Sequence, residues 1–132
     1  MCSIFLVEDH KLMAETLLRI LRTNGNFHVY DAAANAEEAL ERLPRLEVDL
    51  VLVDVVLPHT DGIELVSMIR EKYPHLPCLM ISSWKAEQYV KRSLRAGARG
   101  YVLKDDVQDV IKGIQHVLEG GMYLSKQIQE EN

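Results

Sequence analysis

Short apolar, β-rich runs alternate along the chain with longer stretches in which apolar residues recur at helical spacing. This alternation is the strongest constraint on the fold, because it predicts a parallel sheet built from strand–helix units. Five strands are predicted, over residues 3–7, 28–33, 49–53, 78–82 and 100–103. Several are apolar throughout, as expected of strands covered on both faces. We therefore expect an α/β fold, a flavodoxin-like doubly wound (βα)5 sheet of order 2-1-3-4-5 with helices on both faces.

Five helices are predicted between and after these strands, each bounded by a capping residue or a helix breaker. The expected boundaries are Asn24-Gly25 at the end of the first helix, Asn35 and Pro44 for the second, Asp61 and Pro74 for the third, Ala86 and Gly97 for the fourth, and Asp106 and Gly120-Gly121 for the fifth. Residues 121–132 are polar and lack a periodic pattern, so we expect them to be a terminal segment or the start of a linker.

Composition narrows the class of protein further. The 132 residues carry a formal net charge of −5, which argues against a stand-alone nucleic-acid binder. No apolar run approaches the roughly 18–20 residues needed to cross a bilayer, and the first residues lack the features of a signal peptide. Cys2 and Cys78 form no metal-ligand or redox pair, so both are expected to be reduced thiols. We expect a single cytoplasmic domain without a membrane segment.

Polar residues follow four of the predicted strands. Glu8 and Asp9 follow the first strand, Asp54 the third, Ser82 ends the fourth, and Lys104 follows the fifth. In an open parallel sheet these ends meet at one edge, where ligands bind. Each residue alone has a simpler interpretation, namely a helix N-cap, a turn residue, a strand-end hydroxyl or a solvated lysine. Their joint occurrence at four strand ends favours a functional site.

The chemistry of this group indicates a hard cation and a phosphoryl group. Close carboxylates repel each other unless a cation neutralises them, and Mg²⁺ (or Mn²⁺) prefers oxygen ligands. Asp54 could then act as a nucleophile toward a phosphoryl group, because aspartyl phosphates are an established form of covalent catalysis. Lys104 would neutralise the phosphoryl oxygens, and Ser82 could bond one of them only after transfer, which would make it a switch.

The same residues lie in motifs that resemble the receiver domain of two-component response regulators. The resemblance covers residues 3 to about 119, and any one of its motifs is weak while together they are specific. The motifs are Val7-Glu8-Asp9-His10, then Val53-Asp54-Val55-Val56-Leu57-Pro58 with Gly62, then Met80-Ile81-Ser82-Ser83, and finally Gly97-Ala98-Arg99-Gly100-Tyr101-Val102-Leu103-Lys104.

The resemblance implies a role for each matching residue. Asp54 looks like the phosphoacceptor and a metal ligand, Asp9 like the main metal-binding acid with Glu8 assisting, and Val56 like a ligand through its backbone carbonyl. Ser82 resembles the switch hydroxyl, Lys104 the phosphate-binding lysine, and Tyr101 the aromatic residue whose rotamer follows the switch. The implied donor is the phosphohistidine of a sensor histidine kinase or a small acyl phosphate. The resemblance thus implies a signalling domain that catalyses only its own phosphorylation and dephosphorylation, not an enzyme.

The end of the chain resembles the NarL/FixJ group, through Leu103-Lys104-Asp105 and Gly120-Gly121-Met122-Tyr123-Leu124-Ser125. Members of that group continue into a LuxR-type helix-turn-helix domain that regulates transcription. The expected organisation is therefore a receiver domain over 1–120 and, over 121–132, the start of a linker toward a DNA-binding domain absent from this chain. This fragment itself need not contact DNA. Dimerisation through the last two helices, or through the first and last, is compatible with the sequence.

Two features depart from the common pattern of the family. Asp105 replaces the proline that often follows the lysine, which leaves open whether the Lys104–Asp105 peptide is cis. Val56 and Trp84 occupy the positions that modulate access of the hydrolytic water, and neither side chain binds water well. We therefore expect slow self-dephosphorylation, with Trp84 shielding the site.

Three other functions match parts of this pattern, but each conflicts with particular residues. A haloacid-dehalogenase-like phosphatase needs a second acid two residues after its nucleophile, where this chain has Val56. A nucleotide-binding protein needs a glycine-rich loop after the first strand, which the sequence lacks. A phosphorylation-independent interaction module of the same fold would have no need of Asp9, Asp54, Ser82 and Lys104 together.

Overall fold

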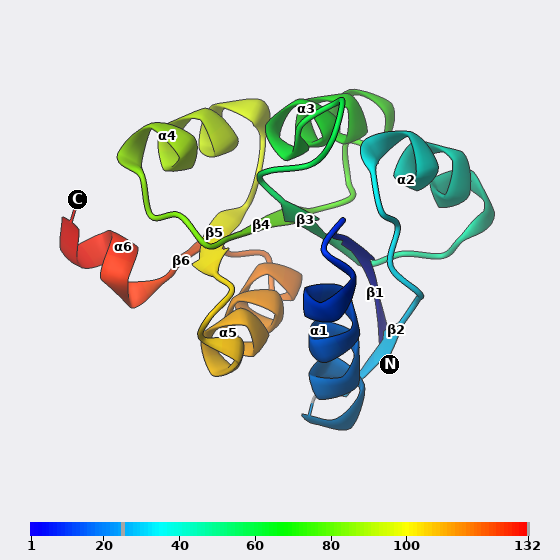
Figure 1. Ribbon diagram of the computed structural model, residues 1–132, viewed down its shortest axis with the longest axis horizontal. Helices are drawn as coiled ribbons and strands as arrows, with labels where there is room; N and C mark the ends of the chain where they lie inside the picture. The colour runs from blue at the N-terminus through cyan, green and yellow to red at the C-terminus, as the bar shows by residue number, and fades with distance from the viewer. Residues whose placement is uncertain (25, 132) are drawn as a thin grey trace.

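One parallel sheet forms the centre of the molecule in the computed structural model, which describes residues 1–24 and 26–131. Its strand order is β2-β1-β3-β4-β5-β6 (Figure 1). The strands are β1 (Cys2–Val7), β2 (Phe27–Val29), β3 (Leu50–Asp54), β4 (Cys78–Ser82), β5 (Gly100–Leu103) and β6 (Tyr123–Leu124). The predicted flavodoxin-like order 2-1-3-4-5 is confirmed, and a short sixth strand extends it.

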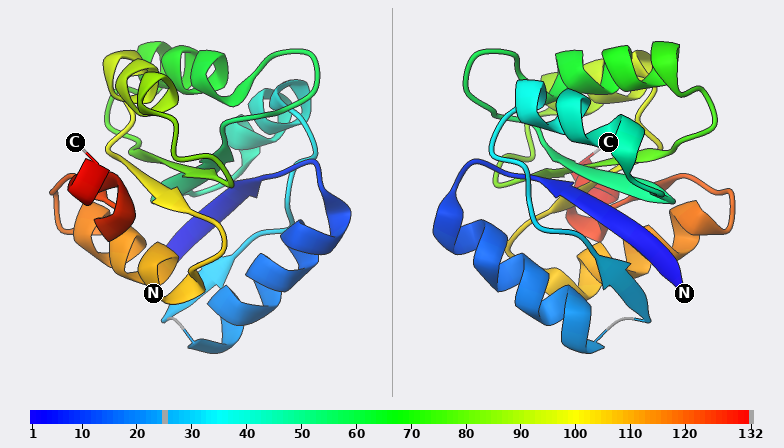
Figure 2. Two further views of the ribbon diagram at one scale, coloured as in Figure 1. Left: turned by 60° about the vertical axis from the view of Figure 1, so that its left-hand side comes forward. Right: turned by 90° about the vertical axis from the view of Figure 1, so that its right-hand side faces the viewer.

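Helices cover both faces of the sheet, as predicted (Figures 1 and 2). One face carries α1 (Lys11–Asn24) and α5 (Val107–Leu118), and the other carries α2 (Ala36–Arg42), the 3-10 turn η1 (Leu43–Arg45), α3 (Gly62–Lys72) and α4 (Glu87–Ala96). Each layer has its own apolar core, because residues of the fully buried strands alternate between the two faces. None of the described helices combines the length and the apolar character that a membrane span requires.

The capping residues predicted from the sequence begin and end the helices where expected. Asn35 accepts a hydrogen bond from Glu38 N at 2.8 Å, and Asp61 accepts one from Glu64 N at 2.8 Å. Asp106 caps α5 in the same way, and Gly97 ends α4 in the left-handed region with φ of 112°. These contacts satisfy backbone groups that a helix end leaves without partners. The predicted left-handed residue Gly25 lies outside the described residues.

The second strand is shorter than predicted. We expected it over 28–33, but regular pairing stops at Val29 and Ala33 forms only an isolated bridge with Val7. Tyr30 N donates to Ile4 O and Ala33 N donates to Leu6 O. Between these two hydrogen bonds the chain moves three residues along after β2 but only two residues along β1. The extra residue interrupts the ladder as a bulge does. The third strand is shifted by one residue, so that Asp54 is its last member.

The polar tail is more ordered than its sequence indicated. Tyr123–Leu124 forms β6, paired in parallel with β5, and α6 (Lys126–Glu131) follows it. Ile128 of α6 is almost completely buried in the same apolar cluster as Tyr101 and Leu103. The residues that we expected to be a terminal segment or the start of a linker thus extend the sheet and the core.

Candidate functional site

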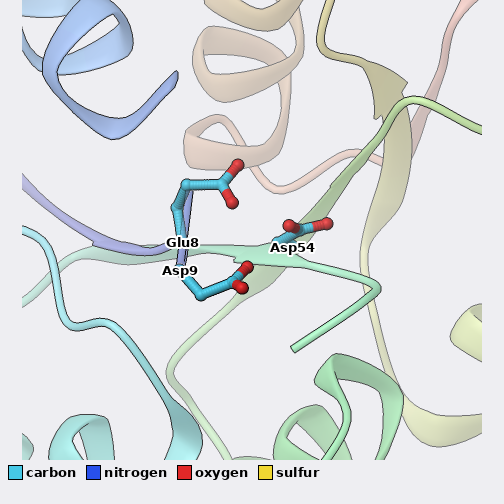
Figure 3. A group of neighbouring side chains, drawn as sticks. All are labelled: Glu8, Asp9 and Asp54. Atoms are coloured by element: carbon cyan, nitrogen blue, oxygen red, sulfur yellow. The ribbon is translucent and has the colours of Figure 1, made fainter. Parts of the chain in front are cut away.

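Three carboxylates meet at the carboxyl end of the sheet. Glu8 and Asp9 directly follow β1, and Asp54 ends the neighbouring strand β3. One oxygen from each lies within 4.8 Å of the others, and Figure 3 shows the three side chains around a common space. Glu8 and Asp54 are buried, whereas Asp9 is exposed. The sequence-based prediction that these residues come together is confirmed.

Lys104 supplies the positive charge of this group. Its Nζ lies 2.8 Å from Asp54 Oδ2 and 2.5 Å from Glu8 Oε1, and the side chain is buried with both partners. Burial alone lowers the pKa of a lysine, but here the bonds to Asp54 and Glu8 outweigh it and raise the pKa of Lys104. The ammonium therefore stays charged and offsets only part of the charge of the three carboxylates.

Asp54 carries a strongly perturbed pKa. Burial raises its pKa from 3.8 to about 7; the neighbouring Glu8 adds to the rise and the Lys104 ammonium opposes it. Asp54 Oδ1 also accepts a hydrogen bond from Val56 N at 3.2 Å. A carboxylate that is costly to ionise in this environment would be stabilised by a further positive charge.

The donor set fits a divalent cation. Among the described residues, Glu8 Oε1 is a buried oxygen without a donor in hydrogen-bond geometry, although Lys104 Nζ is close to it. Three carboxylates with an open coordination face are typical of Mg²⁺, which retains several waters, and no histidine or cysteine ligand that zinc would favour belongs to this cluster. The coarser prediction of a hard-cation site is thus supported by the structure.

A pocket of about 320 Å³ opens over the acidic group. It is lined by Glu8, Asp9, His10, Met13, Asp54, Val56, Ser83, Trp84 and Lys104. Val56 and Trp84 are strongly exposed, at 52% and 60%, so two apolar side chains border a charged cavity. The acidic group and Lys104 thus face one cavity at the carboxyl end of the sheet.

Ser82 and Tyr101 lie behind this pocket and do not line it. Ser82 is fully buried at the end of β4, and its Oγ accepts a hydrogen bond from Trp84 N at 2.9 Å. Tyr101 is also fully buried, and its hydroxyl donates to the carbonyl of Trp84 at 2.6 Å. The loop after β4 is therefore held by both residues at Trp84, which links them through the backbone.

Two local features position the site. Gly62 begins α3, and a Cβ there would lie 1.8 Å from the carbonyl oxygen of Asp54, so only glycine permits this close approach. His10 caps α1, because its Nδ1 accepts a hydrogen bond from Met13 N at 3.2 Å. The cap of α1 is therefore His10, which leaves the Asp9 carboxylate available to the site. The peptide between Lys104 and Asp105 is trans.

Three residues of the pocket were missed by sequence reasoning. His10, Met13 and Ser83 line the cavity. His10 and Ser83 belong to two of the sequence motifs, but no role was predicted for either of them or for Met13. Met13 lies in the first turn of α1, next to the loop that holds Asp9. Their places in the sequence, beside Asp9 and Ser82, indicate position but not which way each side chain points.

A doubly wound parallel sheet with an acidic group and a lysine at the ends of β1, β3 and β5 is typical of receiver domains. The chain belongs to the family of response regulator receiver domains, whose family model matches residues 4–115. It is a signalling module of two-component systems rather than an enzyme with an external substrate.

The relatives of the chain are transcription regulators. It is 31% identical over 127 residues to the transcriptional regulatory protein DegU of Brevibacillus brevis, covering 96% of this chain and 54% of that protein. It is 34% identical over 115 residues to the DNA-binding transcriptional activator DevR/DosR of Mycobacterium tuberculosis, covering 87% and 51%. The chain thus spans about half the length of the curated relatives that it matches.

Solved structures show the same fold. A LuxR-family response regulator from an Aurantimonas species superposes with a TM-score of 0.93 at 29% identity, covering 98% of this chain and 93% of that one. The isolated receiver domain of RcsB from Salmonella enterica, solved with the phosphomimetic BeF3⁻, gives a TM-score of 0.89 at 18% identity, covering 98% and 96%. At that level of identity the second likeness concerns the fold alone.

Proposed function

We propose that this receiver domain accepts a phosphoryl group on Asp54 and thereby controls an output domain beyond residue 132. The observation that carries the proposal is the pairing of a buried Asp54 with Lys104 in an open pocket that also holds Glu8 and Asp9. This pocket combines a nucleophile, a fixed cation and ligands for a second cation, which are the parts that phosphoryl transfer requires.

The proposed metal ligands are Glu8, Asp9, Asp54 and the backbone carbonyl of Val56. When bound there, Mg²⁺ or Mn²⁺ would neutralise negative charge on the carboxylates and on the transferred phosphoryl group. The excess of three carboxylates over the single Lys104 ammonium and the raised pKa of Asp54 both support a cation at this place.

In the proposed transfer, a carboxylate oxygen of Asp54 attacks the phosphorus of the donor. The new P–O bond forms while the P–N bond to the histidine of a sensor kinase breaks, and the leaving imidazole keeps the electron pair. With an acyl phosphate the broken bond is P–O and the leaving group is a carboxylate. Lys104 then moves from the carboxylate to a phosphoryl oxygen, where its charge stabilises the product.

Ser82 and Tyr101 are the proposed switch. After transfer, the Ser82 hydroxyl can donate to a phosphoryl oxygen, a bond that exists only in the phosphorylated state. Its present partner is Trp84 N, so the loop after β4 would shift with it. Tyr101 binds the same residue through its hydroxyl, and its side chain would respond to that shift.

Val56 and Trp84 are the proposed modulators of dephosphorylation. Both line the pocket next to Asp54, and neither side chain can direct a water at phosphorus as a carboxylate or amide could. The phosphoryl group would therefore be lost slowly.

Transcription control is the proposed output. DegU and DevR/DosR are about twice the length of this chain, and the second is a DNA-binding activator by name. By analogy, a sensor histidine kinase is the proposed donor and a C-terminal LuxR-type DNA-binding domain the proposed target, with a homodimer as a possible active form. Residues 1–120 would be the receiver and 121–132 the connection. As for response regulators in general, a cytoplasmic location is proposed.

Intact-protein mass spectrometry tests this function. The protein is incubated with acetyl phosphate and Mg²⁺, beside Asp54→Asn, a magnesium-free sample and the surface control Asp31→Asn, whose side chain is 88% exposed. One added phosphoryl group is expected in the wild type and in Asp31→Asn, and none in the other two.

Two results would overturn the proposal. A folded, metal-binding wild type that gains no mass would favour a phosphorylation-independent interaction module. Steady release of phosphate over many turnovers would instead indicate a phosphatase.

A further inference from the structure

The segment after α5 is docked on the edge of the sheet. β6 pairs with β5 at Gly100 and Tyr101, and α6 follows at the same edge (Figures 1 and 2). Tyr123 N donates to Arg99 O, and Ser125 N donates to Tyr101 O, both at 3.0 Å. Ser125 and Ile128 are almost fully buried. The segment is therefore packed against the β5 edge through Tyr123, Ser125 and Ile128.

Two glycines of the rest of the chain, Gly100 and Gly113, and one of the segment itself, Gly121, let the two parts come close. A Cβ at Gly100 would lie 2.2 Å from the carbonyl oxygen of Tyr123, and one at Gly113 would lie 3.0 Å from the Tyr123 ring. A Cβ at Gly121 would lie 2.4 Å from His116 Nε2. Glycine inside a strand or helix is unfavourable, so Gly100 and Gly113 are positions where close packing of Tyr123 offsets a backbone cost.

Ser125 joins the segment to the end of β5 through a buried hydrogen-bond network. Its Oγ accepts from Leu103 N at 3.0 Å and donates to Asp109 Oδ2 at 2.5 Å, and the Tyr123 hydroxyl donates to the same carboxylate. Asp109 lies on α5 and has no role in the site described above. Because every group in this network has a partner, loss of Ser125 would leave buried polar atoms without one.

The same network touches the residues that surround Asp54. Leu103 precedes Lys104, whose ammonium contacts Asp54. Tyr101 contacts Ser125 through its carbonyl and Trp84 through its hydroxyl. Ile128 lies in one apolar cluster with Tyr101 and Leu103. Two short routes, one through Leu103 and one through Tyr101, therefore connect the docked segment with the phosphorylation site.

We propose that Ser125 and Ile128 are positioning residues for phosphoryl binding at Asp54: docking of residues 121–131 holds Tyr101 in its buried position and holds the β5 end that carries Lys104. The proposal rests on the function proposed above. Docking and phosphoryl binding then favour the same arrangement, so each strengthens the other by the same factor. Phosphorylation would tighten the segment that leads out of the domain.

Beryllofluoride with Mg²⁺ is the probe, because it mimics the bound phosphoryl group without a phosphoryl-transfer reaction. Its affinity is measured by titration for the wild type, Ile128→Ala, Ser125→Ala and the conservative variant Ile128→Val. Gln127→Ala is the matched control, since Gln127 is an exposed neighbour on α6. We expect Ile128→Ala and Ser125→Ala to weaken binding roughly 5- to 10-fold, Ile128→Val to lie close to the wild type, and Gln127→Ala to equal it.

Hydrogen exchange on the wild type tests the reciprocal effect and needs no variant to fold. The amides of Tyr123 and Ser125 report docking, because both donate to the β5 region. Their protection should rise on addition of beryllofluoride by the same factor that the variants lose in affinity. Unchanged protection overturns the proposal.

The outcomes separate the two proposals. If the wild type does not bind beryllofluoride, the function proposed for Asp54 fails. The positioning role fails, and the phosphoacceptor role stands, if Ile128→Ala binds beryllofluoride as well as the wild type does although the amides of 121–131 exchange freely in this variant.

Discussion

Replacing Asp54 by Asn should stabilise the metal-free protein at neutral pH. Burial raises the pKa of Asp54 from 3.8 to about 7. Because the folded protein holds this proton more tightly, the unfolded chain ionises first as the pH rises. The Asp54 contribution to stability is therefore fully present below about pH 3.8 and is lost progressively as the pH rises to about 7.

The size of the effect follows from the shift. One pKa unit corresponds to about 1.4 kcal/mol, so a shift of about three units sets a ceiling near 4 kcal/mol. The pocket is open to water and Asn loses the ion pair with Lys104, so we expect a smaller net gain of about 1–2 kcal/mol. The difference between variant and wild type should shrink toward acid pH, where Asp54 is protonated in both states.

Urea unfolding followed by circular dichroism measures this difference. Wild type, Asp54→Asn and the surface control Asp31→Asn are compared in chelator between about pH 4.5 and pH 8. Mg²⁺ should then stabilise the wild type by about 1.4 kcal/mol at ten times its Kd, and Asp54→Asn by much less. Equal stability of wild type and Asp54→Asn at pH 8 in chelator would refute the argument that ionising the buried Asp54 destabilises the metal-free protein.

Three further outcomes are expected. Trp84→Glu should lose its phosphoryl group several-fold faster than the wild type, because a carboxylate can orient a water molecule at a position where the indole shields the site. The loss of the phosphoryl group is followed over time in Mg²⁺, and a wild-type lifetime of only seconds would contradict the prediction. Burial raises the pKa of the Cys78 thiol to about 12, so iodoacetamide near pH 8 should alkylate Cys2 and not Cys78. Peptide mass spectrometry measures the two labels, and equal labelling would contradict the prediction. Gly113→Ala should lower the thermal unfolding midpoint, because the added Cβ would lie 3.0 Å from side-chain atoms of both Tyr123 and Val102. This steric effect should outweigh the gain of about 1 kcal/mol in helix propensity, so a raised midpoint would contradict the prediction.

Much of the fold could be predicted because its signals are local. Asn35, Asp61 and Asp106 cap helices through hydrogen bonds to residues three positions ahead, so the motif and its partner are both visible in a short window. The bulge after Val29 could not be predicted in this way. It depends on how residues 30–33 pair with β1, which lies more than twenty residues earlier in the chain.

The position of the site residues could also be predicted, but their orientation could not. Parallel strands bring Asp9, Asp54 and Lys104 to one edge whatever the details of packing. The hydrogen bonds that Ser82 and Tyr101 both form with Trp84 depend on the path of the loop after β4. No residue pattern encodes that path, so the link between the two switch residues had to come from the structure.

The docked segment shows what kind of sequence signal was present and overlooked. Gly113 lies in the interior of α5, where alanine would favour the helix by about 1 kcal/mol. A glycine kept at such a position indicates that another part of the chain comes close, but it does not say which part. The polar composition of residues 121–132 gave no indication that this segment packs on α5. Tyr123 and Ser125 are polar residues, and their burial is possible because their hydroxyls donate to Asp109 on α5. The unfavourable helix propensity of Gly113 and the buried carboxylate of Asp109 therefore have one common explanation: both residues of α5 accommodate the segment that follows the helix.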